Sequence, residues 1–210
     1  MRRESSMSIE RWLRLMDAWG FSGNEDVYQS VVAVYSAKSR HYHNAEHVTA
    51  CLRHLDRCIA KLDQPREVEL ALWFHDAIYQ PFSSGNERKS ADWAASFLSA
   101  NDASHDAQDR VRRLIMVTQH NEPTRTNDES MLVDIDLSIL GSDSRSYRLF
   151  EQAVRMEYRL VPSFIYRKRR AGLLRGFLAR ERIYQNEPFA SEREGQARKN
   201  LTTAVSELEK

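Results

Sequence analysis

Apolar residues along most of the chain recur every three or four positions, the spacing that places them on one face of an α-helix. Most of these periodic segments follow the helical period and not the alternating period of a strand. The pattern therefore predicts an all-α fold, a single-domain helical bundle. The predicted helices lie at 8–19, 26–39, after Asn44, at 68–79, after Ser84, around Val111, and at 131–141, 147–161, 164–184 and 190–210.

The predicted helix at 68–79 contains an imidazole and a carboxylate side by side in the sequence, on or next to its apolar face. His75 lies within the apolar stripe of this helix, and Asp76 lies at its border. A carboxylate is seldom buried unless it is paired or binds a cation. The two adjacent side chains therefore indicate a buried metal to which each donates one ligand. The alternative is a satisfied core histidine beside an aspartate at the end of a helix.

Length, charge and cysteine content narrow the class of protein. The 210 residues suffice for one domain with a sizeable core, predicted over residues 8–205, with residues 1–7 as a disordered tail. A net charge of +1 gives no overall field that would draw the chain to nucleic acid or to a membrane. No apolar run approaches the roughly 20 residues that span a bilayer. We expect a cytoplasmic protein in which Cys51 and Cys58 are reduced thiols, and the oligomeric state is left open.

A second group of candidate ligands lies at 41–47, where three of the chain's seven histidines occur. His43 and His47 are four positions apart, a spacing that lets two imidazoles converge on one site. Asn44 is a suitable N-cap, which would place His43 just before a helix and His47 in its first turn. The alternative is a polar helix start with solvated imidazoles.

A third candidate segment, 131–141, contains two aspartates. Two positions along a helix correspond to about 200° of rotation, so Asp134 and Asp136 cannot both face one metal. Asp136 shares its face with the more apolar neighbours and is the preferred ligand. Asp134 is the second choice and would act as a hydrogen-bond acceptor that holds a ligand in place.

The polar loop that follows Asp76 offers residues that could meet a substrate. Ser84 and Glu87 fit a capping box, which would give Glu87 a structural role. In the alternative, the loop folds over the metal and presents Asn86 and Glu87 to a substrate. His120 is either a pocket residue or an imidazole at a helix end that interacts with the helix dipole.

The order His47, His75-Asp76, Asp136 resembles the H…HD…D signature of the HD-domain superfamily of metal-dependent phosphohydrolases. The flanking residues resemble one bacterial branch of predicted metal-dependent HD phosphohydrolases. The resemblance covers nearly the whole chain, residues 8–205. The matching stretches are 42–48, 73–79, 86–91 and 136–141.

The resemblance implies an all-α HD-type bundle in which His47, His75, Asp76 and Asp136 bind a divalent metal. Two imidazoles and two carboxylates suit Mn, Fe, Co, Ni or Zn, with Mg less favoured by imidazole. The expected reaction is hydrolysis of a phosphoester in a small molecule, a nucleotide or related phosphomonoester, by a metal-activated water.

Roles follow for the residues around these ligands. Asp76 is expected to accept the proton of the attacking water through its second oxygen. Arg155 is a candidate pocket residue, although a surface pair between Glu157 and a neighbouring arginine is the simpler interpretation. The candidates that orient phosphate or protonate the leaving group are Arg40, His43 and Glu87, and those that contact substrate are Asn86, His120 and Arg155.

Two other functions stay open at the level of sequence. One is a di-iron oxygenase on the same helices, in which His43 and His120 complete a second metal position. The other is a non-catalytic metal-binding or nucleotide-binding HD domain. The basic run 167–170 circles its predicted helix, so most of it is expected to be solvated, and no specific nucleic acid is predicted as a partner.

Overall fold

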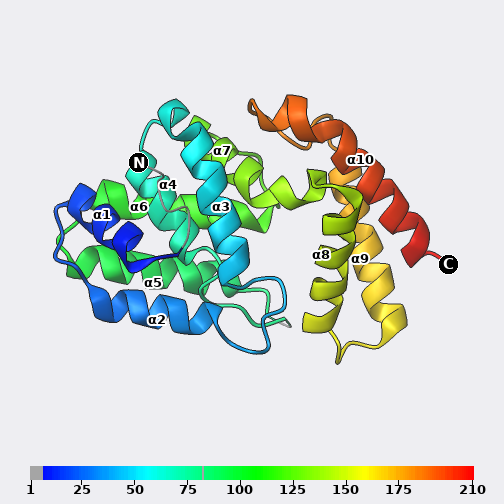
Figure 1. Cartoon of the computed structure of the whole chain (residues 1–210), viewed down its shortest axis with the longest axis horizontal. Coiled ribbons are helices and arrows are strands. Elements are labelled where there is room, and N and C mark those ends of the chain that lie inside the picture. Colours follow the sequence, from blue (N-terminus) through cyan, green and yellow to red (C-terminus); the bar gives the residue numbers. More distant parts are fainter. Residues whose placement is uncertain (1–6, 82) are drawn as a thin grey trace. The chain divides into compact units, whose positions relative to one another are not determined.

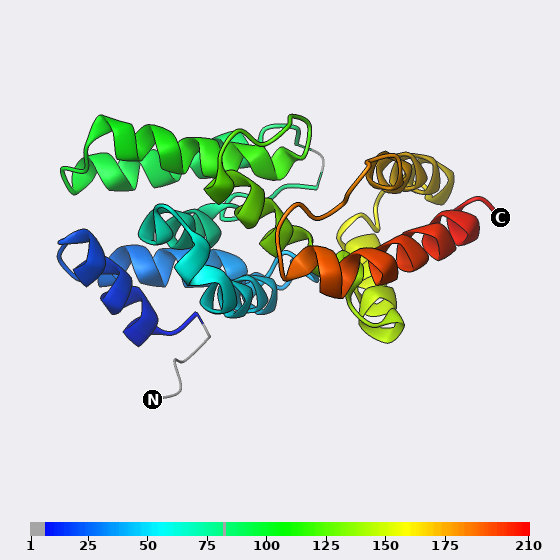
Figure 2. The ribbon, with the colours of Figure 1, turned by 90° about the horizontal axis from the view of Figure 1, so that it is seen from above.

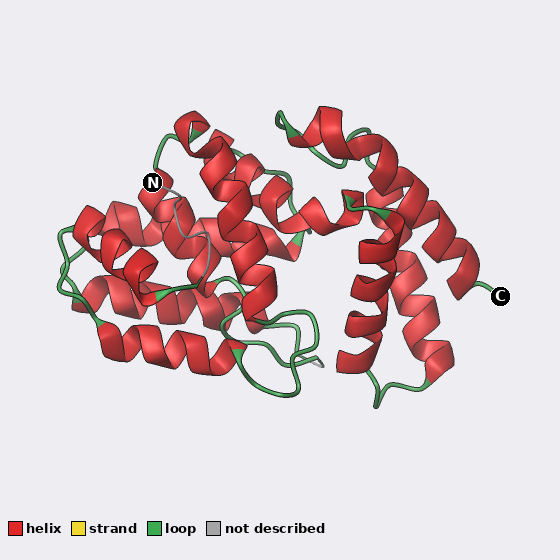
Figure 3. Ribbon diagram, viewed as in Figure 1, coloured by secondary structure: helices red, strands yellow, loops and turns green. Residues whose placement is uncertain are grey.

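The computed structural model describes residues 7–81 and 83–210, and within them the regular secondary structure is helical, without a strand (Figure 3). This confirms the all-α prediction. The disordered tail predicted for residues 1–7 falls, apart from Met7, outside the described residues.

The contacts of the chain divide it into two compact units, one ending at Val133 and the other beginning at Asp134. The prediction of one domain over residues 8–205 therefore stays a prediction. Figure 1 labels the helices of both units. Helix α7 (Asn127–Asp136) begins in the first unit and ends in the second.

The first unit is built from six α-helices and two short 3-10 helices that precede α7. Figure 2 shows α5 and α6 lying side by side. The bounds are α1 (Ile9–Trp19), α2 (Glu25–Tyr35), α3 (Ala45–Cys58), η1 (Ile59–Lys61), α4 (Pro65–Phe74), α5 (Asn86–Ala100), α6 (His105–Met116) and η2 (Val117–Gln119).

Helix α1 has nearly the bounds predicted from the sequence, 8–19. The Ser8 hydroxyl accepts a hydrogen bond from the backbone N–H of Arg11, which satisfies a helix-terminal donor. Gly20 ends the helix in the left-handed conformation at φ 75°, which glycine adopts without a Cβ penalty. By contrast, α2 ends at Tyr35 and not at residue 39 as predicted.

Helix α4 lies at the centre of the first unit, because seven of its ten residues are buried. Trp73 of α4 meets Trp12 of α1 edge to face at a centroid distance of 5.3 Å. Phe74 stacks against Phe97 of α5 at 5.7 Å. Aromatic contacts of this kind add to the free energy gained by burial alone. They fix the end of α4, where the predicted His-Asp pair lies.

The second unit is an assembly of three α-helices and one 3-10 helix. The Asn200 side-chain amide donates to the carbonyl oxygens of Leu140 and Ser142, each at 2.8 Å. Two predicted helices extended too far, because α8 ends at Glu157 and not at residue 161, and α9 ends at Leu178 and not at residue 184. The bounds are η3 (Leu137–Gly141), α8 (Ser144–Glu157), α9 (Ser163–Leu178) and α10 (Phe189–Leu208).

Within the described part of the chain, no helix combines the length and the apolar character that crossing a lipid bilayer requires. Both cysteines are free thiols and buried, as expected from the sequence.

Candidate metal centre

The His-Asp pair was predicted to lie inside a helix. In the structure it lies in the turn that follows α4. The helix ends at Phe74, whereas the apolar pattern predicted helix through residue 79. The helical hydrogen bond of Asp76 is replaced here: the Leu72 carbonyl oxygen, its i−4 acceptor, lies 2.9 Å from Nδ1 of His75. The backbone N–H of Asp76 donates instead to the Tyr35 hydroxyl at 3.2 Å.

The first turn of α3 contributes the second imidazole. Asn44 is the N-cap, as predicted, and its side-chain oxygen accepts from the backbone N–H groups of Glu46 and His47. His47 is buried. The Cys51 sulfur, one turn further along, lies 3.8 Å from both ring nitrogens of His47.

Three donor atoms of the first unit converge at this point. The Nε2 atoms of His47 and His75 are 3.1 Å apart. The Oδ2 atom of Asp76 lies 3.0 Å from Nε2 of His75 and 3.6 Å from Nε2 of His47. The structure therefore brings together three of the four predicted metal ligands from two segments of the first unit.

The protonation pattern of this cluster calls for a positive charge. The Leu72 carbonyl can only accept, so the nearby Nδ1 atom of His75 is assigned the proton. Were His75 neutral, its Nε2 atom would offer a lone pair directly facing the Asp76 carboxylate. Two acceptors 3.0 Å apart repel each other unless a proton or a cation lies between them. An imidazolium or a divalent metal satisfies this arrangement, and the donor set suits the metal.

The carboxyl group of Asp76 is held in its ionised form. Burial would raise its pKa, but the charges of His75 and His43 and the hydrogen bond to His75 outweigh burial, so the pKa lies well below its ordinary value. An ionised carboxylate beside two imidazoles is the form that binds a cation.

Arg40 and Tyr35 hold the turn that presents Asp76. The Arg40 guanidinium donates to the carbonyl oxygens of Asp76 at 2.6 Å, Ala77 at 2.7 Å and His43 at 3.1 Å. It also lies over the Tyr35 ring at 5.1 Å. The structure thus shows Arg40 bound to backbone carbonyls, and its predicted part in orienting phosphate stays a prediction. Tyr35 was missed, because it lies 41 positions before Asp76 and no local motif marks it.

His43 lies beside the cluster, half-buried, with its ring stacked on Tyr79 at a centroid distance of 4.1 Å. Its ring centroid is 6.2 Å from that of His47. The structure therefore brings His43 next to the predicted ligands, and its charge acts on Asp76. Its predicted part in proton transfer stays a prediction.

The first turn of α5 forms hydrogen bonds with the backbone of the segment that follows Asp76. The Asn86 amide donates to the Gln80 carbonyl at 2.9 Å and accepts from the Gln80 N–H at 3.1 Å. The Ser90 hydroxyl accepts from the Ile78 N–H at 3.0 Å. Asn86 therefore holds backbone, and its predicted contact with substrate stays a prediction.

Glu87 has a different environment from the one predicted. The capping box of Ser84 and Glu87 is wrong, since the N-cap of α5 is Gly85 and no side chain caps the helix. Glu87 instead accepts a hydrogen bond from the Gln119 side chain at 3.2 Å. The Glu87 carboxylate therefore does not cap the helix. Its predicted catalytic role stays a prediction.

The two aspartates of α7 differ from the sequence analysis in burial. Asp134 is completely buried, whereas Asp136 is half-buried. Asp134 accepts from the backbone N–H groups of Gln185 at 3.0 Å and Asn186 at 2.6 Å, and so anchors the chain before α10. Burial raises its pKa to about 6 against these hydrogen bonds. Its predicted role of holding a metal ligand stays a prediction.

The remaining candidates lie at chain bends. His120 follows η2 in the left-handed conformation at φ 57°. Arg155 belongs to the second unit, where its guanidinium donates to the carbonyl oxygens of Tyr158 and Val161 and lies over the Tyr166 ring. It fixes the end of α8. Contact of either residue with substrate stays a prediction.

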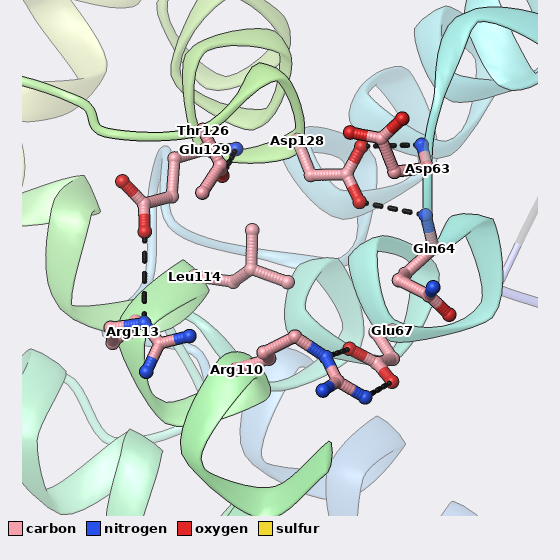
Figure 4. Close-up of a pocket in the computed structure, with 9 residues that line it drawn as sticks. All are labelled: Asp63, Gln64, Glu67, Arg110, Arg113, Leu114, Thr126, Asp128 and Glu129. Carbon is pink, nitrogen blue, oxygen red and sulfur yellow. Dashed lines mark hydrogen bonds and ion pairs between the residues drawn. The ribbon is translucent and has the colours of Figure 1, made fainter. Parts of the chain in front are cut away.

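A separate cavity of about 280 Å³ in the first unit contains none of the predicted site residues (Figure 4). Three of its four carboxylates, those of Glu67, Asp128 and Glu129, are bonded within the protein. Glu67 forms a two-point pair with Arg110, and Asp128 accepts from the backbone N–H groups of Asp63 and Gln64. The cavity is therefore explained by the packing of α4, α6 and α7.

Comparisons of the chain with protein-family models, with curated proteins and with solved structures found no match.

Proposed function

We propose that the chain is a metal-dependent phosphohydrolase of the HD-domain type, acting on a phosphoester of a small molecule such as a nucleotide. The observation that supports this most is the convergence of His47, His75 and Asp76 within 3.0 to 3.6 Å. These residues occupy the H and HD positions of the H…HD…D signature. Their donor atoms suit a divalent cation. The Leu72 carbonyl oxygen lies next to Nδ1 of His75, which leaves Nε2 of that ring as the atom that would bind the ion.

Asp136 is proposed as the fourth ligand. It is the last residue of α7 and corresponds to the final D of the H…HD…D signature. Two imidazoles and two carboxylates would leave coordination positions open for water and substrate on a metal that takes five or six ligands. The same set favours Mn, Fe, Co, Ni or Zn over Mg.

A divalent ion held here would acidify water and offset the charge that develops on phosphoryl oxygens. The residues of the chain supply the remaining functions. The ionised Asp76 carboxylate accepts the proton of the attacking water. His43, held against Tyr79 beside the cluster, transfers a proton to the leaving group. Glu87 is the further candidate to orient the substrate.

The test combines metal analysis with a substrate panel. Protein purified without added chelator is analysed for metals, then assayed on nucleotides and phosphomonoesters with Mn, Co, Ni or Mg. We expect one divalent ion per chain and phosphate release in the wild type. His75→Ala and Asp76→Ala are expected to lose both. His105→Ala, an exposed histidine at the start of α6, is the control and is expected to keep both.

Each other outcome has a distinct meaning. Turnover by Asp76→Ala protein that contains no metal would overturn the proposed mechanism. Bound metal with no phosphate release across the panel would overturn the reaction and favour a non-catalytic domain. Two iron ions per chain with oxygen consumption would favour an oxygenase.

A further inference from the structure

Arg40 is the side chain that ties the two halves of the candidate metal centre together. One half is the loop around His43 that leads into α3 and His47. The other is the turn after α4 that carries His75 and Asp76. The Arg40 guanidinium donates to the carbonyl oxygen of His43 on the first and to those of Asp76 and Ala77 on the second.

We propose that Arg40 is a positioning residue that assembles the metal ligands before the ion binds; this inference rests on the proposed function. A guanidinium has a rigid planar fork of donors, so three hydrogen bonds fix the distance and orientation of the segments it joins. The bonds are 2.6, 2.7 and 3.1 Å long. They hold backbone, and the ligand side chains project from that backbone toward each other.

The aromatic rings around Arg40 restrict the guanidinium further. Its central carbon lies 5.1 Å from the Tyr35 ring centroid and 5.8 Å from that of Tyr79. Tyr35 is buried, and its hydroxyl accepts from the Asp76 N–H. Tyr79 stacks on His43. Arg40 therefore lies over two rings that themselves contact the site, and these contacts add to its hydrogen bonds in holding the guanidinium in place.

Groups that orient metal ligands without touching the metal typically change metal affinity by about 10- to 100-fold when they are removed. We therefore expect Arg40→Ala to bind divalent metal at least about 10-fold more weakly than the wild type. Arg40→Lys keeps a charge and three donors but loses the planar fork, so an intermediate affinity is expected.

Arg66 provides a matched control in the same unit. Its guanidinium also donates to a backbone carbonyl, that of Ala18 at 3.1 Å, and also lies over an aromatic ring, that of Trp19 at 4.6 Å. It joins α4 to α1 at a different place from the candidate centre. The Arg66→Ala substitution also removes a guanidinium that binds a backbone carbonyl and lies over an aromatic ring. The Arg66→Ala protein is expected to bind metal as tightly as the wild type.

The experiment titrates metal-free protein with Co²⁺, followed by visible absorbance and calorimetry, for the wild type, Arg40→Ala, Arg40→Lys and Arg66→Ala. Hydrogen exchange of residues 73–80 is measured on the same metal-free samples. We expect faster exchange there in Arg40→Ala and unchanged exchange in Arg66→Ala. A merely structural role would lower the unfolding temperature without this loss of Co²⁺ affinity.

The outcomes separate the two proposals. Wild-type protein that binds Co²⁺ together with Arg40→Ala that binds it within twofold would overturn the positioning role and leave the proposed function in place. Wild-type protein that binds no Co²⁺ would overturn both. If Arg40→Ala does not fold, Arg40→Lys decides: an affinity equal to that of the wild type overturns the positioning role.

Discussion

The Nε2 atoms of His47 and His75 lie 3.1 Å apart, although the two residues are 28 positions apart in the sequence. Asp76 places a carboxylate oxygen within 3.6 Å of both. Bringing a carboxylate and two imidazole nitrogens this close costs free energy unless a proton or a cation lies among them, because lone pairs that face each other repel. A ligand that binds only the folded chain repays this cost.

Metal binding is therefore expected to stabilise the protein. At a free metal concentration of about 100 times the dissociation constant, the gain in unfolding free energy is about 2.7 kcal/mol. We expect the thermal midpoint of metal-free protein to rise when Mn²⁺ or Co²⁺ is added and to fall again with chelator. His47→Ala is expected to remove the response, and His105→Ala to keep it. A rise of equal size in His47→Ala would contradict the assignment.

The N-cap of α3 is expected to act on metal binding as well as on stability. Asn44→Ala removes an acceptor for the N–H groups of Glu46 and His47, and costs about 1 kcal/mol of unfolding free energy. Because His47 is in the turn that Asn44 caps, we expect Co²⁺ affinity to fall too. Asn44→Asp, which keeps the acceptor, should restore both.

Ser104 caps α6 in the same way, through the backbone N–H of Ala107 at 3.3 Å. Ser104→Ala is therefore the control for the loss of a cap in the same unit. It is expected to lower the unfolding free energy by a similar amount and to leave Co²⁺ affinity unchanged. Equal Co²⁺ affinity in Asn44→Ala and Ser104→Ala would show that the α3 cap does not support the ligand.

Local signals in the sequence predicted the helices and the α3 cap, because both depend on residues three or four positions apart. The end of α4 could not be predicted this way. Ile78 and Tyr79 continue the apolar stripe, and no glycine or proline interrupts it. The helix ends because Leu72 and Tyr35 take up the hydrogen bonds around His75 and Asp76, and the Tyr35 contact is long-range.

The same limit explains the misjudged aspartates. Apolar neighbours along α7 favoured Asp136 as the more buried carboxylate. Asp134 is buried instead, because Gln185 and Asn186, about 50 positions later in the chain, cover it and donate their N–H groups. A helical pattern describes one element and contains no information on which distant loop packs against it.

The pair of Glu67 and Arg110 offers a test of buried charge in the first unit (Figure 4). The Glu67 side chain is 0% exposed and Arg110 is 39% exposed. Arg110→Ala leaves a buried carboxylate unpaired and is expected to cost about 3 kcal/mol of unfolding free energy. Glu67→Gln leaves only an arginine that reaches solvent, so we expect a smaller loss.

Urea denaturation of both variants measures this asymmetry. The exposed pair of Arg112 and Asp92 is the control, since exposed pairs contribute only about 0–1 kcal/mol. Arg112→Ala is expected to lie within that range. If Arg110→Ala were no less stable than Arg112→Ala, Glu67 would not depend on its partner for burial.

Gly141, at the end of η3, provides a test of close packing in the second unit. A Cβ atom at this position would lie 2.5 Å from Cβ of Arg193 and 2.7 Å from its carbonyl oxygen. Both atoms are fixed by the α10 backbone, so a rotamer change cannot relieve the clash. Gly141→Ala is expected to lower the unfolding free energy by about 1–3 kcal/mol, the usual cost of overpacking.

Gly172 is the control, because it is exposed in the middle of α9 and a Cβ there would meet no atom within 4 Å. Gly172→Ala should raise the unfolding free energy by about 0.5–1 kcal/mol, since alanine loses less backbone entropy in a helix. Opposite signs for the two substitutions, measured in urea, would show that η3 and α10 meet as closely as described. A stabilising Gly141→Ala would mean that the two backbones lie further apart.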